Sequence, residues 1–182
     1  LVGSEMCIRD RSYRFGMKIL QLLAGLRALN SVIVRPLRWL ALIMVLLTFA
    51  IVILRYALNS GGILLQESVM YLHGTLFMLA IALGVGDNTH VRVDILYSRR
   101  SPEQQAWIDL VGHILFLLPV AGFMIWVSLP YVSNSWQILE GSSEVGGIPG
   151  VFLLKTLIPL TGALLFCQGI ADVAAILLAK LR

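Results

Sequence analysis

The sequence predicts an all-α integral membrane protein, a four-helix transmembrane bundle preceded by an interfacial amphipathic helix. The mean hydropathy is +0.87, and 58% of the 182 residues are apolar while 13% are charged, roughly half the charged share of a soluble domain. The apolar residues gather in runs of about twenty, which as helices cross roughly 30 Å of hydrocarbon. The basic residues that give the net charge of +4 flank these runs and form no patch, which favours membrane topology over nucleic-acid binding.

The N-terminal residues divide into two parts before the first long apolar run. Leu1–Arg11 (LVGSEMCIRDR) matches the translation of a transposase-type sequencing adapter, and we set it aside as an assembly artefact. The native start is then either Met17 or lies outside this sequence. Within the N-terminal segment 12–36, the stretch Lys18–Asn30 is too short and too charged to span a membrane. It suits an amphipathic helix whose basic side faces lipid headgroups.

The membrane domain, residues 37–182, contains four apolar segments. Each is expected to be a helix, because an isolated strand would leave its backbone groups unpaired in lipid. The third helix has a clear beginning, since Ser101 provides an N-cap, Pro102 takes the first helical position and Glu103 places an acid in the first turn. The predicted spans cover about residues 37–58, 67–86, 103–133 and 151–178.

The third segment is longer than an upright span needs. A helix from Pro102 to Ser133 would be about 50 Å long at 1.5 Å per residue. Its first turns should therefore lie along the membrane surface, or the whole helix should tilt. Pro119 and Pro130 are expected to kink it.

The distribution of lysine and arginine predicts the orientation. Positive charges concentrate before the first span, between spans two and three, and after the fourth, whereas the other two loops contain no basic residue. Because cytoplasmic loops are enriched in lysine and arginine, both termini should be cytoplasmic and the loop Ser135–Gly150 should face the opposite side. The inner basic residues are Lys18, Arg27, Arg35, Arg38, Arg92, Arg99, Arg100, Lys180 and Arg182, and the outer acids are Glu67, Glu140 and Glu144.

The inner connection between spans two and three contains a polar ribbon, HVRVDI. Alternation places His90, Arg92 and Asp94 on one side and three apolar residues on the other. Such a ribbon can lie at the membrane interface with its polar side in water, whereas a soluble strand of this length would have no sheet to join. A solvated turn is the plainer interpretation, and a contact surface for a partner is the functional one.

Two pairs of charged or titratable residues are further candidates for structural or partner contacts. Asp109 and His113 are four residues apart and share a helical face, which predicts a hydrogen-bonded pair, since two ligands alone seldom make a metal site. Arg55 and Glu67 each lie about six residues from the turn at Gly61. At similar depth, the guanidinium and the carboxylate could form an ion pair. The alternatives are that both reach headgroups and water, or that Glu67 bonds to a partner subunit.

Two charges also lie inside the fourth span. Lys155 lies about a turn from its beginning and can extend outward along the helix. Asp172 lies about equally far inside the other end. Charges within a membrane span often mark functional sites, but here both are expected to serve as anchors or packing partners.

At the inner ribbon the sequence also resembles a known family. The stretch HVRVDILYSRRSPEQQAWIDLVG, with LRYALN, LQESVMYLHGTLFMLAIAL, SLPYVSNSW, GGIP and FLLKTLIPL, is similar to the small membrane subunit of tripartite ATP-independent periplasmic (TRAP) transporters, the DctQ-like family. The resemblance covers about Arg38 to Gly169. It is greatest for the branch associated with mannitol or chloroaromatic compounds, although Leu64 stands where many relatives have tryptophan.

The resemblance implies a non-catalytic subunit of a sodium-coupled importer of organic acids or related solutes in the bacterial inner membrane. Its partners would be a large membrane subunit that carries the substrate, a periplasmic substrate-binding protein, and lipid. It would support the large subunit and help to dock the binding protein, with Glu140 and Glu144 as candidate docking charges in the loop Glu140–Gly150. No cofactor, metal or nucleic acid is implied, and the sequence contains no G-x-S-x-G, H-E-x-x-H or P-loop motif.

A haem-binding membrane anchor of an electron-transfer complex is the main alternative function. His73 lies about thirteen residues from the inner end of span two, and His113 about ten from the start of span three. Their depths would differ by roughly 4 Å at 1.5 Å per residue, which allows both to ligate one iron. Both could equally form hydrogen bonds within the bundle. An independent small membrane protein, such as a sensor, is the second alternative.

Overall fold

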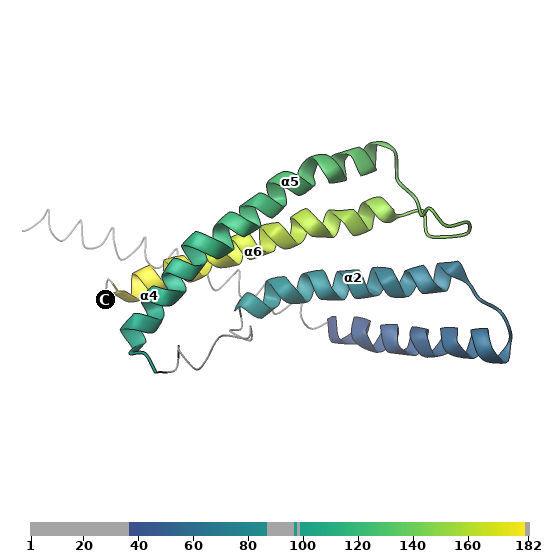
Figure 1. Cartoon of the computed structure of the whole chain (residues 1–182), viewed down its shortest axis with the longest axis horizontal. Coiled ribbons are helices and arrows are strands. Elements are labelled where there is room, and N and C mark those ends of the chain that lie inside the picture. Colours follow the sequence, from purple (N-terminus) through teal and green to yellow (C-terminus); the bar gives the residue numbers. More distant parts are fainter. Residues whose placement is uncertain (1–36, 87–96, 98, 181–182) are drawn as a thin grey trace, which may run out of the picture.

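The computed structural model of the chain describes residues 37–86, 97 and 99–180, and all regular structure in that part is helical (Figure 1). Four helices are long and apolar enough to cross a membrane, which confirms the predicted all-α membrane class. Residues 1–11, the segment 12–36 and the ribbon with His90, Arg92 and Asp94 lie outside the described residues. The helices are Leu37–Ala57, α2 (Ile63–Gly86), α4 (Pro102–Gly112), the π turn η1 (His113–Leu117), α5 (Leu118–Gln137) and α6 (Val151–Lys180).

The helices form two hairpins (Figure 1). Helix Leu37–Ala57 returns as α2 through the turn at residues 58–62, and α5 returns as α6 through the loop at residues 138–150. α6 packs against both α5 and α2. The turn and the loop lie at one end of the bundle, whereas the start of α4 and the C-terminal end of α6 lie at the other. The arrangement agrees with a chain that crosses a membrane four times.

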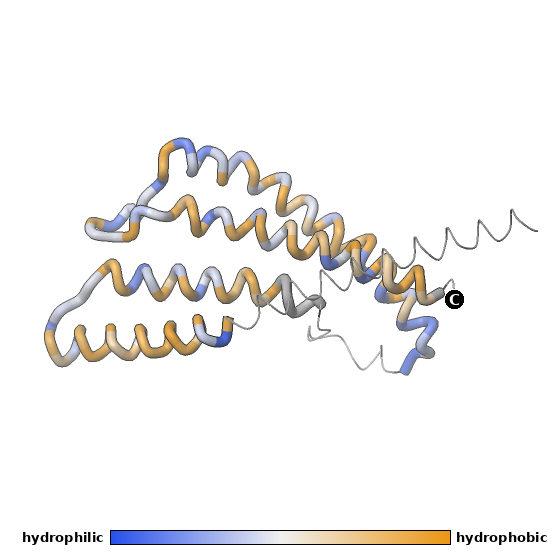
Figure 2. Tube along the Cα trace, turned by 180° about the vertical axis from the view of Figure 1, so that it is seen from behind, coloured by the Kyte–Doolittle hydropathy of each residue, from blue (hydrophilic) through white to orange (hydrophobic). Residues whose placement is uncertain are grey.

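Apolar residues occupy most positions along the helices (Figure 2). Many large hydrophobic side chains are exposed, among them Trp39, Phe49, Phe116 and Trp126. A helix that is hydrophobic all round is buried in a large protein or in a membrane, and soluble monomers rarely expose large contiguous apolar patches. Lipid or another membrane subunit is therefore the natural cover of this surface.

The third span is one long helix, Pro102–Gln137, of 36 residues, or about 54 Å. It begins as predicted, because the Ser101 hydroxyl accepts a hydrogen bond from the backbone N–H of Gln104 (3.4 Å). Before Pro119 the helix widens into the π turn η1, in which the N–H of Leu118 bonds to the carbonyl of His113, five residues back. Pro119 has no N–H to donate. Prolines and π turns are both common at irregular points of a helix, and here the two lie next to each other.

α5 and α6 approach closely because small residues lie where they cross. Ala121 and Thr161 are each 1% exposed. A Cβ atom added at Gly162 would lie 2.9 Å from Cγ1 of Ile125 and 3.3 Å from the carbonyl oxygen of Ala121. Small residues allow membrane helices to pack backbone against backbone, where dispersion contacts and weak hydrogen bonds hold them. The hairpin is therefore a closely packed unit.

α2 turns one stripe of residues toward α6 and the α5–α6 loop. The Thr161 hydroxyl donates a hydrogen bond to the carbonyl of Met78 (3.3 Å). A Cβ atom at Gly74 would lie 3.0 Å from Cδ1 of Leu154, and one at Gly150 would lie 3.8 Å from the Tyr71 ring. Positions 67, 71, 74 and 78 repeat at helical spacing. Residue 67 therefore faces the α5–α6 loop.

Candidate functional site

Polar side chains gather in two clusters at opposite ends of α6. The loop clamp lies at the end with the turn and the loop, and the α4–α6 network lies where α6 meets α4 and η1. The loop clamp comprises Glu67, Ser135, Glu140, Ser142 and Lys155, and the α4–α6 network comprises Tyr97, Asp109, His113, Gln168 and Asp172.

The first half of the α4–α6 network ties the start of the long helix to the residues before it. The Tyr97 hydroxyl donates to Oδ2 of Asp109 (2.7 Å). The Gln105 amide donates to the carbonyls of Tyr97 and Arg100, both at 3.1 Å. These bonds close the chain back onto α4, so they position Asp109 and the next turn of the helix.

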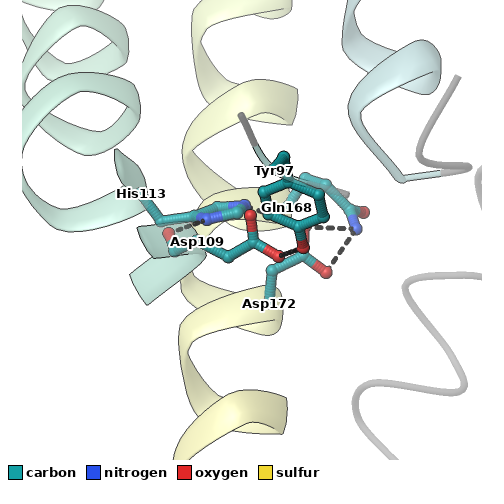
Figure 3. A network of polar contacts seen from close by, with 5 residues as sticks. All are labelled: Tyr97, Asp109, His113, Gln168 and Asp172. Atoms are coloured by element: carbon teal, nitrogen blue, oxygen red, sulfur yellow. Dashed lines mark hydrogen bonds and ion pairs between the residues drawn. The ribbon is translucent and has the colours of Figure 1, made fainter. Parts of the chain in front are cut away.

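The second half joins η1 to α6 (Figure 3). His113 Nδ1 lies 2.6 Å from the carbonyl oxygen of Asp109, and Nε2 lies 3.5 Å from Oδ2 of Asp172. The Gln168 amide donates to Oδ1 and Oδ2 of Asp172 at 3.1 and 3.3 Å. A carbonyl oxygen can only accept, so Nδ1 carries a proton. The contact of Nε2 with Asp172 is an ion pair when His113 is protonated.

The predicted side-chain pair of Asp109 and His113 is thus only partly right. The two residues do meet, but His113 bonds to the backbone carbonyl of Asp109, and its carboxylate partner is Asp172. Asp172 is a packing partner, as expected. Asp172 lies 59 positions after His113 in the sequence, so helical spacing cannot reveal their contact.

We expect His113→Phe to lower the stability of the protein by about 1–3 kcal/mol, because the Asp172 carboxylate loses a partner in a poorly solvated place. Adding Asp172→Leu should recover much of that loss, since removing both polar partners is less costly than removing one. Thermal unfolding of the detergent-solubilised protein measures both variants as a double-mutant cycle. Losses that simply add would show that the two side chains do not act together.

The geometry does not support the haem alternative. His73 is exposed on α2 and stacks on Phe77, with ring centroids 6.2 Å apart. His113 directs Nε2 to Asp172 and Nδ1 to a backbone carbonyl. Neither nitrogen of His113 is free to ligate an iron that His73 would share. Among the described residues, no group of three or more His, Cys, Asp or Glu could hold a metal ion.

In the loop clamp, Glu67 holds the α5–α6 loop to α2. Its Oε2 accepts from the backbone N–H of Ile148 (2.6 Å), and its Oε1 accepts from the Ser142 hydroxyl. Ser142 Oγ also accepts from the N–H of Glu144 (3.1 Å). A Cβ atom at Gly147 would collide with Oγ and Cβ of Ser142 and would lie 2.6 Å from Oε1 of Glu67. The loop therefore needs a glycine at 147 to close over the carboxylate.

Glu140 forms the other half of the clamp. Its Oε2 lies 2.5 Å from Nζ of Lys155 and 2.6 Å from Oγ of Ser135. Lys155 Nζ also lies 4.1 Å from the centroid of the Tyr131 ring. The hydrogen bond from Lys155, and then that from Ser135, lowers the pKa of Glu140. The carboxylate thus stays ionised and its charge is balanced by Lys155, whereas the exposed Glu144 is the remaining candidate for a docking charge.

The predicted ion pair between Arg55 and Glu67 is wrong. Glu67 bonds to Ser142 and Ile148, and no ion pair joins it to Arg55, both residues being within the described part of the chain. Counting residues from the turn predicted a similar depth for the two side chains, but it could not give the face of α2 on which Glu67 lies. That face is the stripe shared with Tyr71, which is turned toward α6.

Sequence reasoning also missed several members of the two clusters. Ser135, Ser142, Tyr97 and Gln168 were not identified as candidates, although Ser142 and Gln168 have local signals. The Ser142 hydroxyl bonds two residues ahead to Glu144, a pattern typical of serine in turns. Gln168 bonds to Asp172 four residues later in α6, a spacing at which helical side chains commonly meet, whereas the bond from Tyr97 to Asp109 depends on how the chain folds back onto α4.

Comparison with known proteins places both clusters inside a family match. Residues 44–179 match the family described as "Tripartite ATP-independent periplasmic transporters, DctQ component". A Haemophilus influenzae protein assigned as a TRAP transporter small permease protein is 33% identical over 76 residues, which is 42% of this chain and 47% of that protein. The aligned part thus spans about half the length of this relative.

Proposed function

The chain belongs to the DctQ component family of tripartite ATP-independent periplasmic transporters, and from this premise we propose that it is the small permease subunit of a sodium-coupled importer. The observation that carries the proposal is the family match, which extends from the first helix almost to the end of α6. The family is a transporter component family and not an enzyme family. The chain is a multi-pass protein of the bacterial inner membrane, in keeping with its four membrane-length helices.

The geometry supports a static role for this subunit. The loop clamp joins α2 to the α5–α6 loop at one end of the bundle, and the contact of His113 with Asp172 joins η1 to α6 at the other. The α5–α6 crossing between them is tight. Polar contacts at both ends oppose sliding of the helices past each other, so the bundle suits a scaffold for a moving partner.

The partners follow from this role. A large membrane subunit would pack on the exposed apolar faces and carry the substrate and sodium, and the α5–α6 loop would face the periplasm and help to dock a substrate-binding protein. The transported solute would be an organic acid or a related compound, and the mannitol or chloroaromatic branch stays a prediction of the sequence resemblance.

Reconstitution tests the proposed function. The chain is co-purified with the large subunit encoded beside it, and a panel of organic acids is screened for thermal stabilisation of the neighbouring binding protein. Uptake of the stabilising acid into proteoliposomes should require a sodium gradient, the binding protein and this chain. Full uptake without this chain would contradict the proposed function. A Soret absorption band in the purified chain would favour the haem anchor.

The proposed orientation predicts a labelling pattern. In a chain with Cys7 and Cys167 replaced by alanine, Val145→Cys in the α5–α6 loop should react with a membrane-impermeant thiol reagent added to intact cells. Gln104→Cys, near the start of α4, should react only after the cells are opened. Both side chains are exposed, so solvent access does not distinguish them. The reversed pattern would place the loop in the cytoplasm and contradict the docking role.

A further inference from the structure

We propose that three apolar side chains of the α5–α6 loop, Ile138, Leu139 and Val145, form a patch on which the periplasmic binding protein docks reversibly. These residues are here called the apolar loop patch. The inference rests on the proposed function, because it names the surface of this chain that the soluble partner would contact. It adds apolar contacts to the candidate docking charge of Glu144 and leaves Glu140 out of the docking surface.

The three side chains are exposed and lie outside the candidate membrane spans. Ile138, Leu139 and Val145 are 72%, 64% and 93% exposed. They lie beyond Gln137, where α5 ends, and before Val151, where α6 begins. Exposed apolar residues on the helices have lipid as a natural cover, whereas the proposed topology places the loop in the periplasm. Apolar surface in water is unfavourable, and grouped exposed side chains of this kind often mark interaction sites.

The loop presents the patch in a fixed shape. Two carboxylates hold the loop from inside, Glu67 through Ser142 and Ile148, and Glu140 through Ser135 and Lys155. Both acids are part-buried by these bonds, whereas the three apolar side chains are exposed. A surface that is already ordered loses less conformational entropy when a partner binds, so even a small contact can contribute to docking.

Leu139 has a conformation that leucine rarely adopts. Its φ is +46°. The N–H of Leu139 donates to the carbonyl of Trp136 (3.2 Å), and the N–H of Glu140 donates to the carbonyl of Ser135 (3.0 Å). This is the Schellman pattern that ends a helix, in which glycine usually occupies the left-handed position. The chain has a leucine there, largely exposed, so its side chain contributes little burial in return for the unfavourable backbone.

The size and charge of the loop indicate the partner. A stable protein interface uses about 20–30 residues a side, and the loop has thirteen, from 138 to 150. It suits a contact that forms and breaks, as docking of a soluble carrier requires. Because Lys155 balances the charge of Glu140, Glu144 is the exposed charge beside Val145. The complementary surface on the binding protein is therefore an apolar patch with a basic residue at its edge.

The test measures binding directly. The complex of this chain with its large subunit is embedded in nanodiscs, and the fluorescently labelled binding protein encoded beside it is titrated in. The triple variant Ile138→Ser, Leu139→Asn, Val145→Ser should raise the Kd at least about fivefold, as expected for loss of contact residues of this type. Leu58→Ser, an exposed apolar residue of the turn at the same end, should leave the Kd unchanged.

A third variant separates docking from folding. Leu139→Gly removes the side chain and also relieves the left-handed backbone, so it should weaken docking while raising the melting temperature of the complex. A structural role alone would not weaken binding in a more stable protein. Normal docking by both Leu139→Gly and the triple variant would overturn the inference.

Two other outcomes would contradict either the inference or the proposed function. If the triple variant fails to co-purify with the large subunit, or changes the mass of the complex, the patch belongs to a contact inside the membrane assembly and the inference is overturned. If the unaltered complex itself does not bind the binding protein, the proposed function fails rather than the choice of residues.

Discussion

Replacing Glu67 with alanine is expected to free the α5–α6 loop from α2 and to lower the stability of the protein by about 2–4 kcal/mol. The carboxylate accepts hydrogen bonds from the N–H of Ile148 and the hydroxyl of Ser142, and hydrogen bonds to a charged group are stronger than those between neutral groups. Alanine leaves both donors without this acceptor. Thermal unfolding in detergent measures the loss, and limited proteolysis at the loop should show faster cleavage.

Three further variants identify the cause. Glu67→Gln keeps an oxygen for the Ile148 N–H, so its loss should be smaller. Gly147→Ala should also disturb the clamp, because its Cβ would collide with the Ser142 side chain and with the Glu67 carboxylate that Ser142 bonds. The exchange Arg55→Glu with Glu67→Arg should restore nothing. Recovery by the exchange would return Arg55 as the partner of Glu67 and contradict the structure.

Glu67 also illustrates which parts of the fold can be predicted from the sequence. Hydropathy and length gave the four helices, because burial in lipid depends on the composition of one segment at a time. The Ser101 cap was predictable for a similar reason, since its partner is three residues away. The start of α2 was harder. The helix begins at Ile63, four residues before Glu67, because the loop satisfies a charge that by itself would mark a span boundary.

The candidate site depended more on packing than on spacing. The spacing of Asp109 and His113 showed that they share a face, but Asp172 approaches from a helix that begins almost 40 residues later. Likewise, the residue count placed Arg55 and Glu67 at similar depth, but the face of α2 is decided by its contact with α6. The role as a transporter subunit came from the family resemblance, because neither composition nor periodicity distinguishes one four-helix membrane protein from another.

A substitution at the α5–α6 crossing is expected to have the other large effect on stability. Gly162→Ala is expected to destabilise the protein by about 1–3 kcal/mol, the usual cost of adding volume to a packed core. The new Cβ would lie 2.9 Å from Cγ1 of Ile125, a β-branched side chain with little rotamer freedom in a helix, and 3.3 Å from the carbonyl oxygen of Ala121. The helices must therefore separate, and Gly162→Leu should separate them further and lose more.

Gly122→Ala is the matched control, since it makes the same change on the facing helix. Its Cβ would lie 3.8 Å from the Phe166 ring, an ordinary contact, so alanine should be neutral or gain the usual helical advantage over glycine. Thermal unfolding of both variants in the same detergent gives the comparison. Equal stabilities would mean that Gly162 does not set the distance between α5 and α6. A loss confined to Gly162→Ala would instead show that backbone contact at this crossing holds the hairpin together, because the two variants differ only in the room available for one methyl group.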